Sequence, residues 1–120
     1  MFKGISSYSK ILSVSNPNVY AIYDARVAAS LNAIQLLAVS APIVRFPIPP
    51  TKSEAVKRLA NTLRSERSID IIRDEAYLAY LEVLRAVRRQ LNQKYQLWEL
   101  EMVLFALAPR LAREVCPPTT

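Results

Sequence analysis

The stretch VYAIYDARVAASL, residues 19–31, organises the predicted fold. Its apolar first half ends at Asp24, a residue type that caps helices because its carboxylate accepts free backbone N–H groups of the first turn. We therefore expect a helix from Asp24 to Val39. Upstream, the turn residues and the proline of SNPN, residues 15–18, end an earlier helix over residues 6–14. The pattern leaves open whether Asp24 is only a cap or also takes part in chemistry.

The rest of the chain is also predicted to be helical, because one glycine in 120 residues leaves few tight turns for a β fold. A third helix opens at TKSE, where Thr51 and Glu54 have the spacing of a capping box. Further helices are expected over residues 74–92 and 96–115. Residues 41–50, APIVRFPIPP, contain four prolines and predict an extended strap. The predicted fold class is all-α, a compact bundle of about five helices with one strap.

The length and composition of the chain restrict the number of domains, the kinds of site and the kinds of partner that it can have. A chain of 120 residues predicts one helical domain over residues 1–120. With one cysteine and no histidine, the common zinc ligand sets are missing, so we expect no metal site and no cofactor. No apolar run approaches the length of a membrane span, which predicts a cytoplasmic protein without a membrane partner. The net charge of +6 suits an acidic partner, although a solvated basic surface accounts for it equally well.

Two charged residues fall inside apolar faces of the predicted helices. On a helical wheel, Glu101 lies among Leu97, Leu104 and Ala108, and Arg88 lies among apolar residues of the preceding helix. A charge stranded in a core costs several kcal/mol, so a buried carboxylate needs a partner. We therefore predict a structural ion pair between Glu101 and Arg88, and a loss of stability at neutral pH when Glu101 is replaced by Gln.

Residues 2–31, FKGISSYSKILSVSNPNVYAIYDARVAASL, resemble a segment of the helix-hairpin-helix DNA glycosylases, especially the 8-oxoguanine glycosylase-like branch. The resemblance continues in YLEVLRAVRRQLN at 80–92 and WELEMVLFALA at 98–108. It implies that Gly4, Ile5 and Ser6 bind a DNA phosphate through backbone N–H groups at a helix N-terminus. It also implies that Asp24 is the carboxylate that stabilises positive charge on the sugar during base excision.

The departures from this family are informative. Its bifunctional members carry a lysine nucleophile four residues after the hairpin glycine, where this chain has Tyr8. Lys10 follows two residues later, so a catalytic role for Lys10 requires a shifted alignment. The first hairpin helix and the second lobe that encloses a flipped base have no counterpart here. We therefore expect no efficient base excision by the chain alone.

Two functions from different classes remain open. The first is non-specific binding of duplex DNA by a truncated glycosylase-like protein, with Arg85 and Arg89 as further phosphate contacts beside Gly4, Ile5, Ser6 and Tyr8. The second is a small helical module that binds an acidic or apolar protein surface and has no role with nucleic acid. Tyr20 and Tyr23 fit stacking on a base or, in the second case, packing against the core.

The helix expected over residues 96–115 carries more apolar residues than one neighbouring layer can cover. A two-fold dimer is the commonest way in which soluble chains bury such a face. We therefore expect a homodimer whose interface includes this helix, with Trp98 or Phe105 near its centre.

Overall fold

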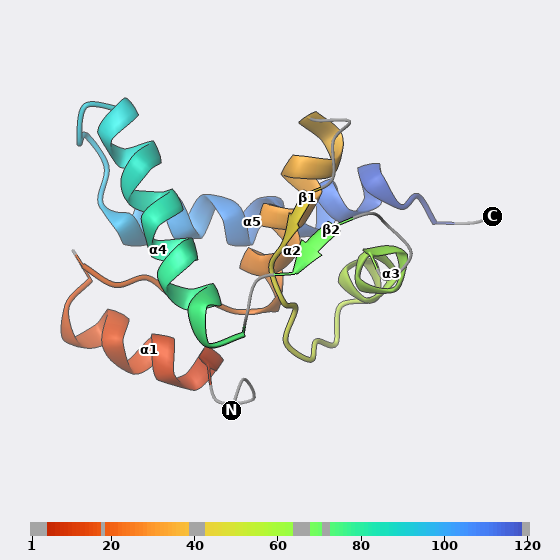
Figure 1. Ribbon diagram of the computed structural model, residues 1–120, viewed down its shortest axis with the longest axis horizontal. Coiled ribbons are helices and arrows are strands. Elements are labelled where there is room, and N and C mark those ends of the chain that lie inside the picture. Colours follow the sequence, from red (N-terminus) through yellow and green to blue (C-terminus); the bar gives the residue numbers. More distant parts are fainter. Residues whose placement is uncertain (1–4, 18, 39–42, 64–67, 71–72, 119–120) are drawn as a thin grey trace.

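The computed structural model describes residues 5–17, 19–38, 43–63, 68–70 and 73–118, except for the side chains of residues 5–8, 43, 68–70, 73 and 74. Its elements are α1 (Ile5–Ser15), α2 (Ala25–Ala38), β1 (Ile43–Arg45), α3 (Glu54–Leu63), β2 (Ser68–Asp70), α4 (Arg73–Gln90) and α5 (Leu97–Val115) (Figure 1). The all-α fold class is confirmed, and the predicted helix ends lie within two residues of those observed. In this part of the chain no helix is both long and apolar enough to cross a membrane.

Helix α2 is the centre of the fold, with α5 across it, α3 at one end of the molecule and α1 and α4 at the other (Figure 1). One half of the core joins α2 to α3 and α5. Alanines at the crossing, among them Ala29 on α2 and Ala108 and Ala112 on α5, are fully buried. Their small side chains let the helix axes approach closely, while Leu59 of α3 fills the remaining space.

The other half of the core is aromatic. Tyr23, which precedes α2, and Tyr80 of α4 are both fully buried and meet edge to face, with ring centroids 5.5 Å apart. Such a pair is worth about 0.5–1.5 kcal/mol beyond its area burial. Tyr77 lies next to Tyr80, and Leu81 and Leu97 complete the cluster. The burial of Tyr23 favours packing against the core over stacking on a base.

The strap forms strand β1 over residues 43–45 and has no regular secondary structure over residues 46–50, while residues 41 and 42 lie outside the described part. Two polar side chains of α2 hold it. Asn32 Nδ2 donates to the Phe46 carbonyl and Asn32 Oδ1 accepts from the Phe46 N–H, both at 2.8 Å. Gln35 makes the same pair of bonds with the backbone of Val44. These two side chains therefore satisfy the backbone N–H and carbonyl groups of Val44 and Phe46 on the edge of the strap that faces α2.

A short parallel pairing of β1 with β2 was not predicted. In this pairing Val44 lies opposite Ile69, and one further pair of residues lies on either side. Each strand has three residues, so neither has enough sequence to show the alternation that identifies a strand.

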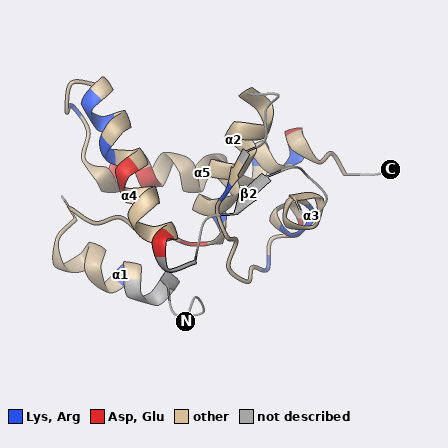
Figure 2. Cartoon of the chain, in the orientation of Figure 1, with Lys and Arg blue, Asp and Glu red and all other residues tan. Residues whose placement is uncertain are grey.

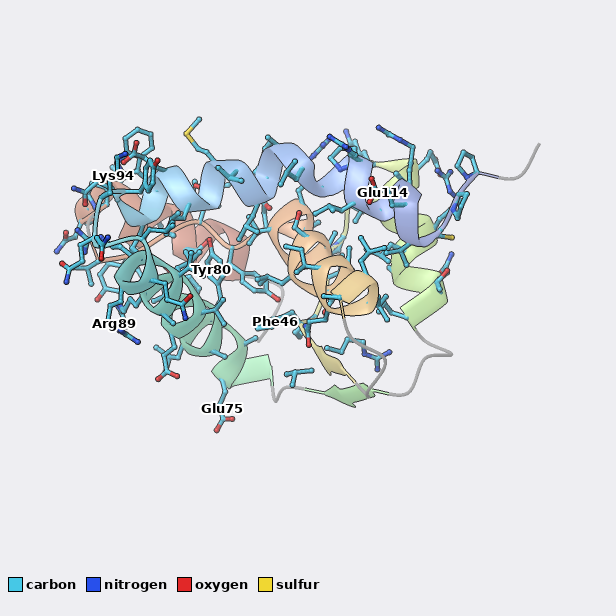
Figure 3. The ribbon with its side chains drawn as sticks, turned by 90° about the horizontal axis from the view of Figure 1, so that it is seen from above. Phe46, Glu75, Tyr80, Arg89, Lys94 and Glu114 are labelled. Atoms are coloured by element: carbon cyan, nitrogen blue, oxygen red, sulfur yellow. The ribbon has the colours of Figure 1, made fainter. Side chains whose placement is uncertain are left out.

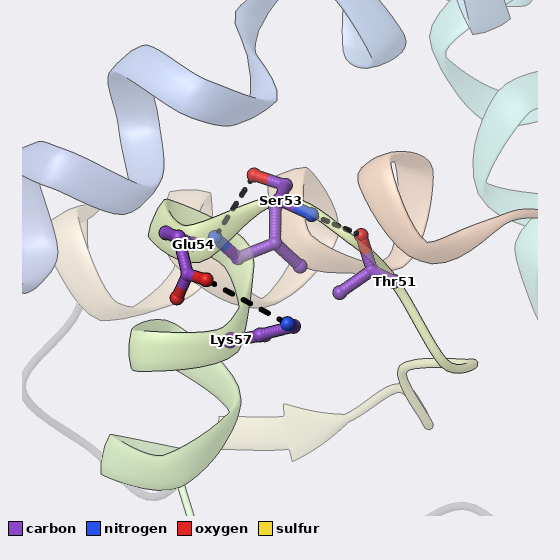
Figure 4. Close-up of polar contacts among 5 residues, drawn as sticks. Thr51, Ser53, Glu54 and Lys57 are labelled. Carbon is purple, nitrogen blue, oxygen red and sulfur yellow. Dashed lines mark hydrogen bonds and ion pairs between the residues drawn. The ribbon is translucent and has the colours of Figure 1, made fainter.

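The predicted capping box of Thr51 and Glu54 is wrong, because α3 begins two residues later than that pattern requires. Ser53 is the cap: its Oγ accepts from Val56 N–H at 3.3 Å, and its carbonyl accepts the first helical bond from Lys57 (Figure 4). Thr51 Oγ1 instead accepts from the Ser53 N–H, and Glu54 forms an exposed ion pair with Lys57.

Candidate functional site

The segment before Asp24 is held by hydroxyl groups from two helices. Tyr77 and Tyr80 of α4 donate to the carbonyls of Ala21 and Ile22, each at 2.7 Å. Helical periodicity in a sequence shows on which face of α4 these tyrosines lie, but not the hydrogen-bond partners of their hydroxyl groups. These bonds fix the backbone that leads into α2 and thereby fix the position of Asp24.

Helix α1 is joined to the same segment through Ser9. Its buried Oγ accepts from Tyr23 N–H at 2.9 Å and donates to the Tyr23 carbonyl at 3.3 Å. The neighbouring Lys10 is exposed on α1. The chain therefore brings the helix that carries Lys10 beside the residue that precedes Asp24, while the Lys10 side chain itself faces solvent.

Asp24 is the N-cap of α2. Its Oδ1 accepts from Val27 N–H at 2.9 Å, and its carbonyl accepts the first helical bond from Ala28. The side chain is half-buried. The cap role predicted for Asp24 is confirmed, and the catalytic role stays a prediction.

Glu101 of α5 is buried, as predicted, with only 7% of its surface exposed. Burial, and then the charge of Asp24, raises the pKa of the Glu101 carboxyl from 4.5 to about 7. Burial, and then Glu101, likewise raises the pKa of the Tyr80 hydroxyl. Asp24, Tyr80 and Glu101 therefore form one electrostatic cluster, in which Glu101 holds its proton near neutral pH.

The predicted ion pair between Glu101 and Arg88 is not formed. Arg88 Nε donates to the Tyr95 carbonyl at 2.8 Å, in the turn between α4 and α5. Arg88 does lie on the predicted side of α4, but its long side chain carries the guanidinium out of the core to this carbonyl. None of the basic side chains that the structure describes forms an ion pair with Glu101, which agrees with its raised pKa.

The structure describes little of the DNA contacts predicted near the N-terminus. Gly4 is not among the described residues. Ile5, Ser6 and Tyr8 belong to the first turns of α1, but their side chains are not described. The hairpin contact therefore stays a prediction.

The C-terminal end of α4 gathers positive charge. Arg85, Arg88 and Arg89, together with Gln93, border a hollow of about 270 Å³. Arg85 Nη2 donates to the Val19 carbonyl at 3.1 Å, so two of the three guanidiniums are oriented by backbone carbonyls. Figure 2 shows the basic residues at this end of α4, and in Figure 3 Arg89 lies on the outer side of the helix, whereas Tyr80 lies toward the core.

The turn after α4 shapes one side of this hollow. Asn92 and Gln93 both have positive φ, at 58° and 56°, and the Gln93 N–H donates to the Arg88 carbonyl at 2.8 Å. This left-handed turn ends the helix and bonds a carbonyl that the helix leaves free. Arg88 was not predicted to border this hollow because its place on the helical wheel had suggested an ion pair with Glu101.

A second and much larger hollow, of about 1270 Å³, is a groove between α4 and α5 with parts of α2 and β1 at its floor. Its walls are apolar, with Val83 and Val87 on α4, Leu91 in the turn directly after α4, and Trp98, Met102 and Val103 on α5. Asp24 borders neither this groove nor the arginine hollow. Within the described part of the chain, no group of three or more side chains could bind a metal ion.

Comparison with known proteins gives no relative: no family model matches this sequence, and neither a curated protein nor a solved structure matches it significantly.

Proposed function

We propose that this chain binds the phosphate backbone of duplex DNA, without strong sequence preference, through the hollow bordered by Arg85, Arg88 and Arg89. The observation that supports the proposal is that three guanidiniums surround one small hollow whose described lining contains no carboxylate. None of the three forms an ion pair with a described residue. Each guanidinium has five N–H donors in a planar fork, and this geometry matches phosphate oxygens.

The hollow has a size suited to a small anionic group. Its volume of about 270 Å³ lies near the lower end of the range for ligand pockets, roughly 300–1,000 Å³. Because the carbonyls of Val19 and Tyr95 orient Arg85 and Arg88, these side chains lose less freedom when they bind an anion. The overall charge of +6 draws a polyanion toward the chain.

The resemblance to the helix-hairpin-helix glycosylases is a second support, because Arg85 and Arg89 lie in one of the segments that carry it. We further propose that the isolated chain does not excise bases efficiently. Asp24 caps α2, and neither hollow offers a pocket for an extruded base beside it. Duplexes with oxidised, alkylated or deaminated bases should stay intact. Turnover that Asp24→Asn abolishes would make Asp24 catalytic.

Fluorescence anisotropy of a labelled 20-base-pair duplex tests the proposal over a series of salt concentrations. We expect a Kd of about 10⁻⁴ to 10⁻⁶ M near physiological salt, weakening as salt rises. Each of Arg85→Ala and Arg89→Ala should weaken binding to all sequences and reduce the slope of log K against log salt by about 0.9.

Lys52→Ala is the matched control, because it removes one exposed positive charge outside the hollow. It should leave the slope nearly unchanged. No binding at about 50 mM salt would refute the proposal, and equal losses in Lys52→Ala and Arg89→Ala would show that only the net charge matters.

A further inference from the structure

The groove between α4 and α5 has the form of a site for a helix. Val83, Val87 and Leu91 are spaced by four residues and make one ridge that runs along α4 into the turn directly after it, and each is more than a third exposed. Ridges of this spacing pack into the grooves of another helix. The volume of about 1270 Å³ exceeds the roughly 300–1,000 Å³ of small-molecule pockets, which indicates a segment of protein as the occupant.

Helix α5 also presents an apolar ridge to solvent beside this groove. Trp98, Met102 and Phe105 are spaced by four and three residues, with 41%, 55% and 42% of their surfaces exposed. This is the spacing of a seam between two packed helices. Arg26 lies over one face of the Phe105 ring, at 5.2 Å from its centroid, and the ring stays partly open. Ridge and groove share Trp98 and Met102, so they form one continuous apolar surface.

The charges along α5 favour one orientation of a pairing with itself. Glu99 lies in its first turn, whereas Arg110, Arg113 and Glu114 lie toward its C-terminal end, where Arg110 pairs with Glu114 at 3.5 Å and Arg113 leaves a net positive charge. Two antiparallel copies of α5 place the acidic end of one beside the basic end of the other, whereas a parallel pair places like charges together. Ala106, exposed near the middle of the helix, leaves room for a close approach.

We propose that a second copy of this chain covers this surface, with the two α5 helices antiparallel about a two-fold axis. Because α5 carries the ridge and also forms one wall of the groove, each copy gives its α5 ridge to the groove of the other, and the interface closes without leaving either exposed. A monomer leaves this surface open to water, including Trp98, Met102, Val103 and Phe105 of α5, each of which is more than two-fifths exposed.

Sedimentation equilibrium of the full chain at micromolar concentration tests this proposal. We expect the wild type at twice the chain mass. Met102→Glu and Val87→Glu, at exposed positions on the two walls, should each raise the dimer Kd at least tenfold while the helical circular dichroism stays unchanged. Val14→Glu is the matched control: Val14 is 84% exposed on α1, outside groove and ridge, and its variant should stay dimeric.

The orientation has its own test. Arg113→Glu places a negative charge where Glu99 of the other copy is expected and should weaken the dimer several-fold at low salt, whereas Lys52→Glu, with the same change of charge, should not. A wild type that stays monomeric refutes the proposal. So does a dimer that Val14→Glu weakens as much as Met102→Glu, and equal effects of Arg113→Glu and Lys52→Glu refute the antiparallel arrangement.

Discussion

Replacing Glu101 with Gln should stabilise this protein at alkaline pH, although the sequence alone predicted a loss. Glu101 is buried beside Asp24 and has no cationic partner among the described residues, so its ionised form is disfavoured in the fold. Gln keeps the shape of the side chain and cannot ionise. The substitution therefore removes a charge that the folded chain accommodates poorly.

The magnitude follows from the pKa. In the unfolded chain the carboxyl ionises near pH 4.5, and in the fold near pH 7. Below pH 4.5 it is protonated in both states and costs nothing. Between these values the unfolded chain releases its proton first, so the wild type loses stability as pH rises, and above pH 7 the loss is complete. At about 1.4 kcal/mol per pH unit, the free energy of unfolding lost between these two pKa values is at most about 3.4 kcal/mol. Residual solvent screening lowers this loss to on the order of 2 kcal/mol.

Urea unfolding of wild type and Glu101→Gln between pH 4 and pH 9 measures this difference. The two free energies of unfolding should agree at pH 4 and separate progressively, with the variant more stable at pH 9. Glu82→Gln, at an exposed position of α4, is the control and should show no such separation. Asp24→Asn keeps a good cap and should lower the pKa of Glu101. If the Gln variant is less stable than wild type at neutral pH, that result would support an ion pair of Glu101 and refute this account.

Four further substitutions test the fold by thermal or urea unfolding. Ser53→Ala should cost about 1 kcal/mol because it removes the cap of α3, and Thr51→Ala should cost less; the reverse order would support a capping box at Thr51. Asn32→Ala leaves two backbone groups of the strap unpaired and should cost on the order of 3 kcal/mol, so a cost below about 1 kcal/mol would show that the strap does not depend on them. Tyr80→Phe removes the bond to the Ile22 carbonyl and should cost about 1 kcal/mol, and no loss would mean that water replaces the hydroxyl.

The helices could be predicted from the sequence because apolar periodicity and caps are local signals. Asp24 was correctly placed as the cap of α2, since it is the only capping residue directly before that helix. Thr51 was chosen wrongly because TKSE offers two hydroxyl groups within three residues, and only the start of the helix at Glu54 decides between them. The burial of Glu101 followed from its position on the helical wheel.

Contacts between elements could not be predicted in the same way. The position of Arg88 on the wheel was correct, but how far its side chain reaches depends on how α4 and α5 cross. The pairing of β1 with β2 joins residues about 25 positions apart and leaves no local pattern. The excess of apolar residues on α5 was visible in the sequence, whereas the groove beside it arises only when α4 is placed.

Mapping by ¹H–¹⁵N NMR during titration with a short duplex is the most direct test of the proposed DNA interface. With ¹⁵N-labelled protein at about 50 mM salt, the largest shifts should fall on Arg85, Arg88, Arg89 and the turn through Gln93, and should fade as salt rises. Shifts concentrated on the basic residues of α3, such as Lys57 and Arg58, or no shifts at all, would contradict the assignment of DNA binding to the arginine hollow of α4.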